Sequence, residues 1–216
     1  MSSLTAGVSG GMVVGLLLAS GFGRRFDAGG RRNKLLARLP DGRTVVSASA
    51  RALCEALDHV AIVIPARGVL LEAALSDLPV RLVRNSRAKE GIGASIAVGV
   101  ATLKADYPQA AGWLIALGDM PFILPRTIRA IAETLPAVNG SKGRVAVAAS
   151  YQGRRGHPVV FSRAFDDALL RLDGDAGASS VLATADVRAV ECEDPGILRD
   201  IDTREDLELV MQTASR

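Results

Sequence analysis

The chain has 216 residues, of which 49% are hydrophobic and 23% are charged, so its composition is that of an ordinary globular protein with a sizeable core. Its formal charge of +3 is too weakly positive to indicate nucleic-acid binding, and it suits an anionic small molecule. We therefore expect no nucleic acid as a partner, and because apolar runs do not reach membrane-spanning length, we expect no membrane either.

The cysteines and the start of the chain favour a cytoplasmic protein. Cys54 and Cys192 are far apart and lack the spacing of a metal site or a disulfide framework, which fits a reducing cytosol. Residues 1–12 lack the charged beginning of a signal peptide, so we expect a flexible lead-in followed by one domain at 13–216.

Taken in chain order, buried apolar runs alternate with segments whose apolar residues recur at helical spacing. Strands are expected at 13–18, 60–64, 80–83, 113–117, 145–149 and 187–192. Helices are expected at 44–57, 67–75, from the glycines before 95 to about 104, 125–135, 165–172, and from Asp202 or Thr203 onward. This alternation predicts an α/β fold with a mostly parallel sheet, which binds ligands at the carboxyl ends of its strands.

The segment after the first strand has the character of a phosphate-binding loop. Small residues, Ala19-Ser20-Gly21 and Gly23, allow backbone N–H groups to approach a ligand closely. Cations follow at Arg24, Arg25, Arg31, Arg32 and Lys34. Neither a Walker loop nor a dinucleotide fingerprint matches, because Lys34 precedes Leu35 and Phe26 stands where a third glycine is needed. The alternative is a glycine-rich surface turn with solvated arginines.

This stretch, LLLASGFGRRF…NKLL, resembles the N-terminal signature of the MobA-like nucleotidyltransferases, and within them most closely that of the molybdenum cofactor cytidylyltransferases. The matching residues are Leu18, Ala19, Gly21, Arg25 and Lys34. Gly23 and Phe26 replace a usual serine and methionine, and the segment between Arg25 and Lys34 is longer. The resemblance implies a single three-layer α/β/α, Rossmann-like domain of the nucleotide-diphospho-sugar transferase type.

The segment after the third expected strand resembles the part of the family that approaches the nucleobase. Asn85, Gly91 and Ser95 lie in it, and the start of a helix presents free N–H donors. Ser95 could read a base edge, or it could cap the helix. Ala19-Ser20-Gly21 replaces the double glycine of the guanylyl-transferring branch, so the resemblance favours cytosine.

Two acidic segments are candidates for a metal site. Asp119, in Gly118-Asp119-Met120-Pro121, follows a buried strand, where an unpaired carboxylate would be costly. It either binds a cation or caps the helix that begins near Pro125, and the resemblance implies magnesium. Asp200 and Asp202 share one face of an extended segment, and Asp202 is the more favoured second ligand.

The segment Gly153–Phe161 resembles the family's element beside the acceptor substrate. Arg155 and His157 could bind an anionic acceptor, or be a solvated arginine and a turn histidine. A later segment, 174–178, resembles a family motif but has Ser179 in place of its arginine, and Asp175 is expected to cap the next helix.

The resemblance implies transfer of CMP from CTP to the phosphate of molybdopterin with release of pyrophosphate. Lys34, Arg25 and Asp119 would be catalytic, with Mg²⁺ on Asp119 and Asp202 and the acceptor on His157 and Arg155. The nucleotide would be bound by Leu18, Ala19, Ser20, Gly21, Gly23, Lys34, Asn85, Gly91 and Ser95. Alternatives are an enzyme that uses GTP or another acceptor, and a non-catalytic protein that delivers the cofactor. A molybdoenzyme or its maturation factor is an expected partner.

Overall fold

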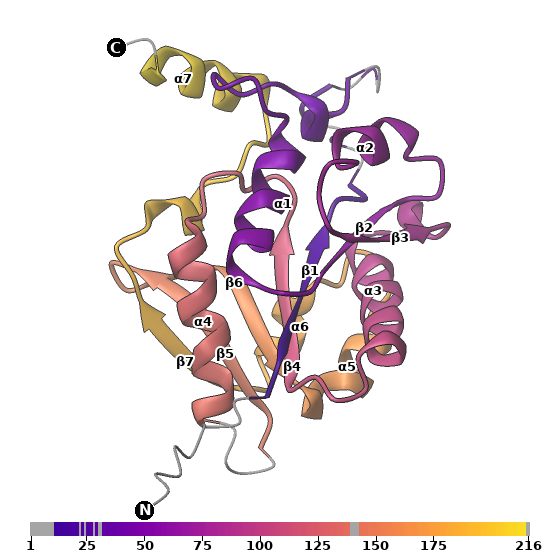
Figure 1. Cartoon of the computed structure of the whole chain (residues 1–216), viewed down its shortest axis with the longest axis vertical. Helices are drawn as coiled ribbons and strands as arrows, with labels where there is room; N and C mark the ends of the chain where they lie inside the picture. Colours follow the sequence, from indigo (N-terminus) through magenta and orange to yellow (C-terminus); the bar gives the residue numbers. More distant parts are fainter. Residues whose placement is uncertain are drawn as a thin grey trace, which may run out of the picture.

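The structure is a computed structural model that describes residues 11–21, 23, 25–27, 29, 32–138 and 143–214. Most of the expected lead-in, residues 1–10, lies outside this range, as do Arg24 and Arg31. The described residues form one seven-stranded sheet in the order β3-β2-β1-β4-β6-β5-β7 (Figure 1). Its strands are β1 Val13–Leu18, β2 Val60–Pro65, β3 Arg81–Asn85, β4 Gly112–Leu117, β5 Val145–Tyr151, β6 Arg154–Ser162 and β7 Asp186–Glu191.

The helices connect these strands and cover both faces of the sheet (Figure 1), which confirms the α/β fold predicted from the alternation and the three layers that the resemblance implies. They are α1 Val45–Ala56, α2 Val69–Ala74, α3 Ile92–Asp106, α4 Pro125–Val138, α5 Asp166–Leu170, α6 Ala178–Leu182 and α7 Arg204–Ala214. One apolar core includes residues of α1 and α4, and a second includes residues of α3, α5 and α6. Trp113, Phe161 and Phe165 are the largest side chains in the second core.

Strand β6 is the main departure from the sequence prediction, which assigned no strand to 154–162. It lies between β4 and β5 and is antiparallel to both, whereas β1, β2, β3 and β4 are mutually parallel. Its first half, Arg-Arg-Gly-His-Pro, has no apolar alternation, so local pattern did not reveal a strand. Pairing with β4 and β5 supplies the stabilisation that local propensity lacks.

Several caps also differ from expectation. Ser95 lies inside α3, which begins after Gly91, and α6 begins after Gly177, so neither Ser95 nor Asp175 is an N-cap. Asp194, and not Asp119, accepts hydrogen bonds from Leu124 N and Thr127 Oγ1 at the start of α4. The expected cap of α7 is present, because Thr203 and Asp206 exchange backbone-to-side-chain hydrogen bonds.

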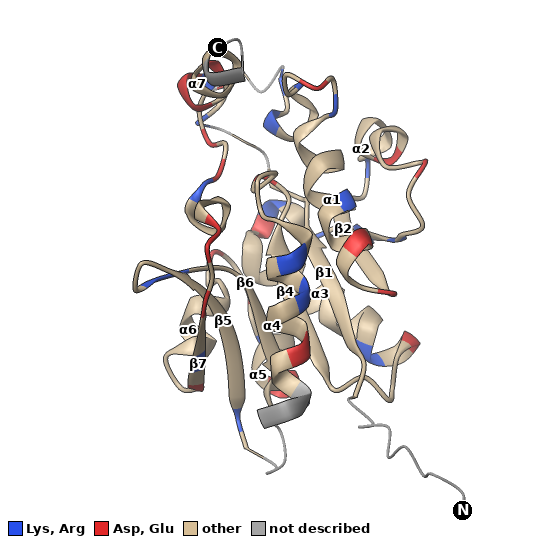
Figure 2. Ribbon diagram, turned by 60° about the vertical axis from the view of Figure 1, so that its left-hand side comes forward, with Lys and Arg blue, Asp and Glu red and all other residues tan. Residues whose placement is uncertain are grey.

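The parallel arrangement brings the ends of three strands to one edge of the sheet. Leu18 pairs with Leu117 and with Val63, and Asn85 pairs with Pro65, so the segments after β1, β3 and β4 meet there. The strands β1, β2 and β4 contain no charged residue, and charged residues lie mostly on helices and connecting segments (Figure 2). No helix in the described part of the chain is both long and apolar enough to cross a membrane.

Candidate active site

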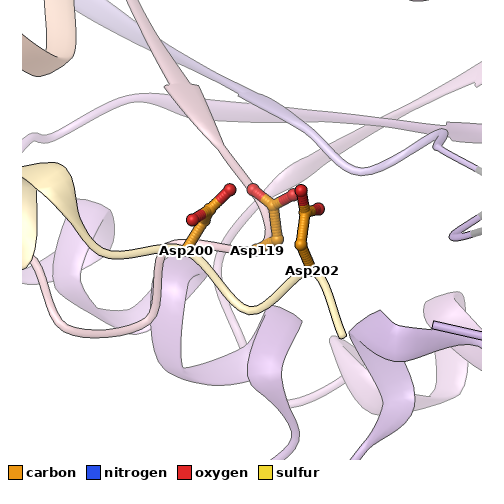
Figure 3. A group of neighbouring side chains, drawn as sticks. All are labelled: Asp119, Asp200 and Asp202. Atoms are coloured by element: carbon orange, nitrogen blue, oxygen red, sulfur yellow. The ribbon is translucent and has the colours of Figure 1, made fainter. Parts of the chain in front are cut away.

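Three carboxylates gather where β4 ends. Asp119 follows β4, while Asp200 and Asp202 lie on the segment that leads to α7, and one oxygen from each lies within 4.8 Å of the others (Figure 3). The backbone fixes this arrangement, because Ile201 N donates a hydrogen bond of 2.9 Å to Asp119 O. The expectation that Asp119 and Asp202 lie close together therefore agrees with the structure.

Lys34 bridges two of these carboxylates. Its Nζ lies 2.6 Å from Asp119 Oδ2 and 2.6 Å from Asp202 Oδ1, and its side chain is only 10% exposed. Burial alone would lower the pKa of Lys34, but the Asp119 and Asp202 carboxylates together raise it above its ordinary value. The lysine is therefore held as an ammonium ion against the acidic cluster.

A second cation reaches the same cluster from the solvent side. Arg25 Nη1 lies 2.6 Å from Asp202 Oδ2, and the arginine side chain is 78% exposed. Exposed ion pairs contribute little to stability, so this contact orients the two groups more than it stabilises the fold. Three carboxylates and two cations thus occupy one small region.

The donor set fits a divalent metal ion. Asp119 Oδ1 is buried and has no hydrogen-bond partner among the described residues, although a buried carboxylate oxygen is normally satisfied. Burial, followed by the negative charge of Asp202, raises the pKa of Asp200, so the surroundings disfavour a charge on this third carboxylate in the absence of a further cation. Carboxylate oxygens are the ligands that Mg²⁺ and similar hard cations prefer, so Asp119, Asp200 and Asp202 can hold such an ion.

A cleft of about 550 Å³ opens over this cluster. The candidate residues on its wall are Leu18, Ser20, Gly21, Gly23, Arg25, Lys34, Gly91, Ser95, Asp119 and Asp202. Ala19 and Asn85 are not on the wall but buried behind it. Lys89, Glu90, Asp175 and Asp200 also line the cleft, and nothing in the local sequence singled out the first two. Lys89 and Glu90 line the cleft because loops that follow different strands lie side by side there.

A buried hydrogen-bonded chain supports one side of the cleft. Ser20 Oγ and Ser95 Oγ are 2.6 Å apart, and Asn85 Nδ2 donates to Ser95 Oγ at 3.1 Å. Ser95 is also within 3.3 Å of Gly91 O, so its hydroxyl has protein partners for both its donor and its acceptor roles. Since Ser95 donates to Gly91 O, Ser20, which lines the cleft, donates its proton to Ser95 Oγ and keeps acceptor capacity.

The N-terminus of α3 is partly covered by the segment before α6. Gly93 N donates a hydrogen bond of 2.9 Å to Gly174 O, so at least one of the N–H groups expected to be free is paired. Gly91 has φ of +129°, and a Cβ there would lie 2.2 Å from Gly174 O. Only glycine permits this close approach of the two loops.

A second, mostly apolar pocket of about 390 Å³ adjoins the cleft, and the two share Leu18, Ile92 and Leu117 in their walls. Its apolar walls include Ile96, Ile115, Val159, Phe161 and Leu182. Val159 and Phe161 belong to the segment that resembles the family's acceptor element, whereas the sequence indicated only a core role for Ile96, Ile115 and Leu182. The pocket is therefore a product of the folded sheet.

The candidate acceptor residues Arg155 and His157 both line this pocket. Arg155 is exposed, whereas His157 Nδ1 is buried and has no hydrogen-bond partner among the described residues. Burial lowers the pKa of His157 below its ordinary value of 6.5, against the opposing effect of the Asp119 carboxylate. His157 is consequently neutral at neutral pH and is not a fixed positive charge for binding a phosphate. Ser179 lies on the same wall.

Comparison with known proteins gives consistent matches along the chain. The family model for the MobA-like NTP transferase domain matches residues 15–190. The purine catabolism protein PucB of Bacillus subtilis (strain 168) is 30% identical over 214 residues, covering 94% of this chain and 98% of that protein.

Solved structures show the same architecture. Rv0371c from Mycobacterium tuberculosis H37Rv has a TM-score of 0.76 and 27% identity, covering 94% of this chain and 100% of that chain. Its manganese complex has a TM-score of 0.71 and 27% identity, with coverage of 94% and 99%. A nucleotidyl transferase from Methanothermobacter thermautotroptrophicus has a TM-score of 0.74 and 25% identity, with coverage of 94% and 99%. With its parallel sheet and its cationic and acidic cleft after β1 and β4, the chain belongs to the MobA-like NTP transferase domain family.

Proposed function

We propose that this protein transfers CMP from CTP to the phosphate of a molybdopterin-type acceptor and releases pyrophosphate. One observation carries the proposal: a cleft containing cations and carboxylates adjoins an apolar pocket, and the two share Leu18, Ile92 and Leu117 in their walls. The cleft suits a triphosphate and the pocket suits a ring system, so their junction is where the two substrates would react.

The charged residues of the cleft match the needs of nucleotidyl transfer. This reaction needs in-line positioning and neutralisation of charge on phosphoryl oxygens, with little covalent chemistry from the protein. Lys34, Arg25 and the backbone at Gly21 and Gly23 would contact the triphosphate. A phosphate acceptor is already ionised at neutral pH, so no strong general base is required.

Asp119 and Asp202, with Asp200 beside them, would hold a divalent ion, for which we propose Mg²⁺. Such an ion, when bound, neutralises charge on the phosphate oxygens. The similarity to a protein whose structure was solved as a manganese complex supports a divalent ion in this family. The orphaned Asp119 Oδ1 supports it independently from this chain's own geometry.

The pocket supports a planar acceptor more than a polyol. Its walls are mostly aliphatic and aromatic, so they offer few hydrogen-bond partners to a chain of hydroxyl groups. Arg155 at the exposed side would contact an anionic group. His157 would contact the ring through a neutral imidazole.

The choice of cytosine rests on the first loop, Ala19-Ser20-Gly21, which lacks the double glycine of the guanylyl-transferring branch. The product would pass to a molybdoenzyme or to its maturation factor, and the similar protein PucB is named for purine catabolism.

The test is pyrophosphate release by purified protein with CTP, Mg²⁺ and molybdopterin, compared with GTP and ATP. We expect release with CTP to exceed release with the other nucleotides by at least about tenfold, the effect of one well-made base contact. A preference for GTP would contradict cytidylyl transfer and indicate guanylyl transfer instead. Binding of molybdopterin without turnover of any nucleotide would instead identify a delivery protein.

A further inference from the structure

Lys34 occupies the position that a metal ion would need. Its ammonium lies 2.6 Å from one oxygen of Asp119, which follows β4, and 2.6 Å from one oxygen of Asp202, which precedes α7. These are the same carboxylates that make up the candidate metal cluster. In the ligand-free protein the cation position is thus held by a residue of the chain itself.

The backbone at Lys34 is anchored, and the side chain adjoins the glycine-rich loop after β1. Lys34 begins a short 3₁₀ helix, Lys34–Leu36, which is anchored because Leu35 N donates to Asn33 Oδ1. The lysine stem lies over the phosphate-binding loop, since a Cβ at Gly23 would be 3.2 Å from Lys34 Cγ. Rotation about side-chain bonds would therefore carry the ammonium from the carboxylates to a phosphate on that loop.

We propose that Lys34 closes the metal site of the ligand-free protein, so that metal ion and triphosphate bind as a unit and free metal binds only weakly. A metal ion alone must displace a mostly buried ammonium that gains no new partner. A triphosphate supplies that partner, because its oxygens replace the carboxylates that the lysine gives up. This coupling rests on the proposed function, in which a nucleotide enters the cleft.

Arg25 cannot close the site in the same way. It contacts the other oxygen of Asp202, forms no ion pair with Asp119 among the described residues, and is 78% exposed. Its contact can be exchanged with water at little cost. Only Lys34 is therefore expected to close the site, and removal of its ammonium should specifically raise the affinity of the protein for a metal ion.

The first experiment measures Mn²⁺ binding without nucleotide, from the electron paramagnetic resonance signal of the free ion. Lys34→Met is expected to bind Mn²⁺ at least about fivefold more tightly than the wild type, the lower end of typical coupling between sites. Lys89→Met is the matched control, because Lys89 is exposed on the same cleft and its loss changes the net charge equally. The gain should disappear in Lys34→Met/Asp119→Asn.

If Lys34→Met gains no more affinity than Lys89→Met, the proposal is wrong. A second measurement uses the wild-type protein, so it does not depend on the folding of a variant. Acetylation of Lys34 by acetic anhydride, followed by mass spectrometry, should be slow in EDTA and faster in saturating Mn²⁺, which releases the ammonium. An unchanged rate in saturating Mn²⁺ would also overturn the proposal. Neither measurement uses CTP or an acceptor, so the results do not depend on whether the protein transfers a nucleotide.

Discussion

At the scale of single residues, the site consists of cationic and acidic side chains that neutralise one another. Asp119 has one oxygen on Lys34 and the other buried without a partner among the described residues. A buried carboxylate oxygen without a partner lowers the stability of the folded protein, but it is available to bind a cation.

Replacement of Asp119 by asparagine should abolish turnover while the fold is retained. The amide keeps the shape of the side chain but lacks the charge that a divalent ion and Lys34 require, so we expect a loss on the order of 10²–10³-fold or more in kcat. Pyrophosphate release measures activity, and circular dichroism measures folding. Asp175→Asn is the control, because Asp175 lines the same cleft outside the acidic cluster. Near-normal activity of Asp119→Asn would contradict the metal assignment.

His157 should make stability depend on pH below neutrality. Burial lowers its pKa in the folded protein, so the unfolded chain binds more protons between the folded pKa and 6.5. The free energy of unfolding is therefore expected to fall as pH falls through 6.5, with a slope approaching about 1.4 kcal/mol per pH unit at most.

Urea denaturation from pH 7 to pH 5 would measure this slope. His157→Gln should flatten it, because glutamine does not titrate. Equal slopes for the wild type and His157→Gln would show that His157 is not responsible.

At the scale of elements, the cleft proposed to bind the nucleotide depends on loops that approach each other closely. The segment before α6 touches the start of α3 through Gly174 and Gly91, and through an ion pair of Arg87 with Asp173. Gly91 holds a positive φ that other residues rarely adopt. This contact sets one wall of the cleft.

Gly91→Ala should destabilise the protein by about 1–3 kcal/mol, because the new methyl group meets Gly174 O and the backbone is strained. Urea denaturation provides the free energy of unfolding. Gly21→Ala, where a Cβ would meet nothing within 4 Å, should change it by less than about 0.5 kcal/mol. The prediction fails if the two variants are equally stable.

At the scale of the whole molecule, the site is divided between distant parts of the chain. Lys34 and Asp119 are 85 residues apart in sequence, and Lys34 and Asp202 are 168 apart. A ligand that bridges them binds only the folded chain, so binding should stabilise the entire domain.

CTP with Mg²⁺ should therefore raise the free energy of unfolding, by about 2.7 kcal/mol at a ligand concentration one hundred times the Kd. Thermal denaturation with CTP and Mg²⁺, and with CTP and EDTA, would measure this effect. The shift should be clearly smaller in EDTA, because the acidic cluster then repels the triphosphate. Equal shifts in both conditions would mean that the carboxylates do not take part through a metal ion.

The sequence alone determined the features that depend on local pattern. Apolar runs predicted β1, β2, β4 and β5, shorter or mixed runs predicted β3 and β7, and their alternation with helical segments predicted the mostly parallel sheet. Small residues after β1 and the carboxylate after β4 marked the edge at which the cleft lies. These predictions succeeded because burial on two faces and close backbone approach leave clear signals in neighbouring residues.

Only the tertiary structure decided which distant residues meet. The insertion of β6 between β4 and β5 places Arg155 and His157 beside the cleft, and the backbone link from Ile201 to Asp119 assembles the carboxylates. The bridging of these carboxylates by Lys34 follows from the same arrangement. Such contacts depend on strand order and loop packing, to which residues throughout the chain contribute, so no local pattern specifies them.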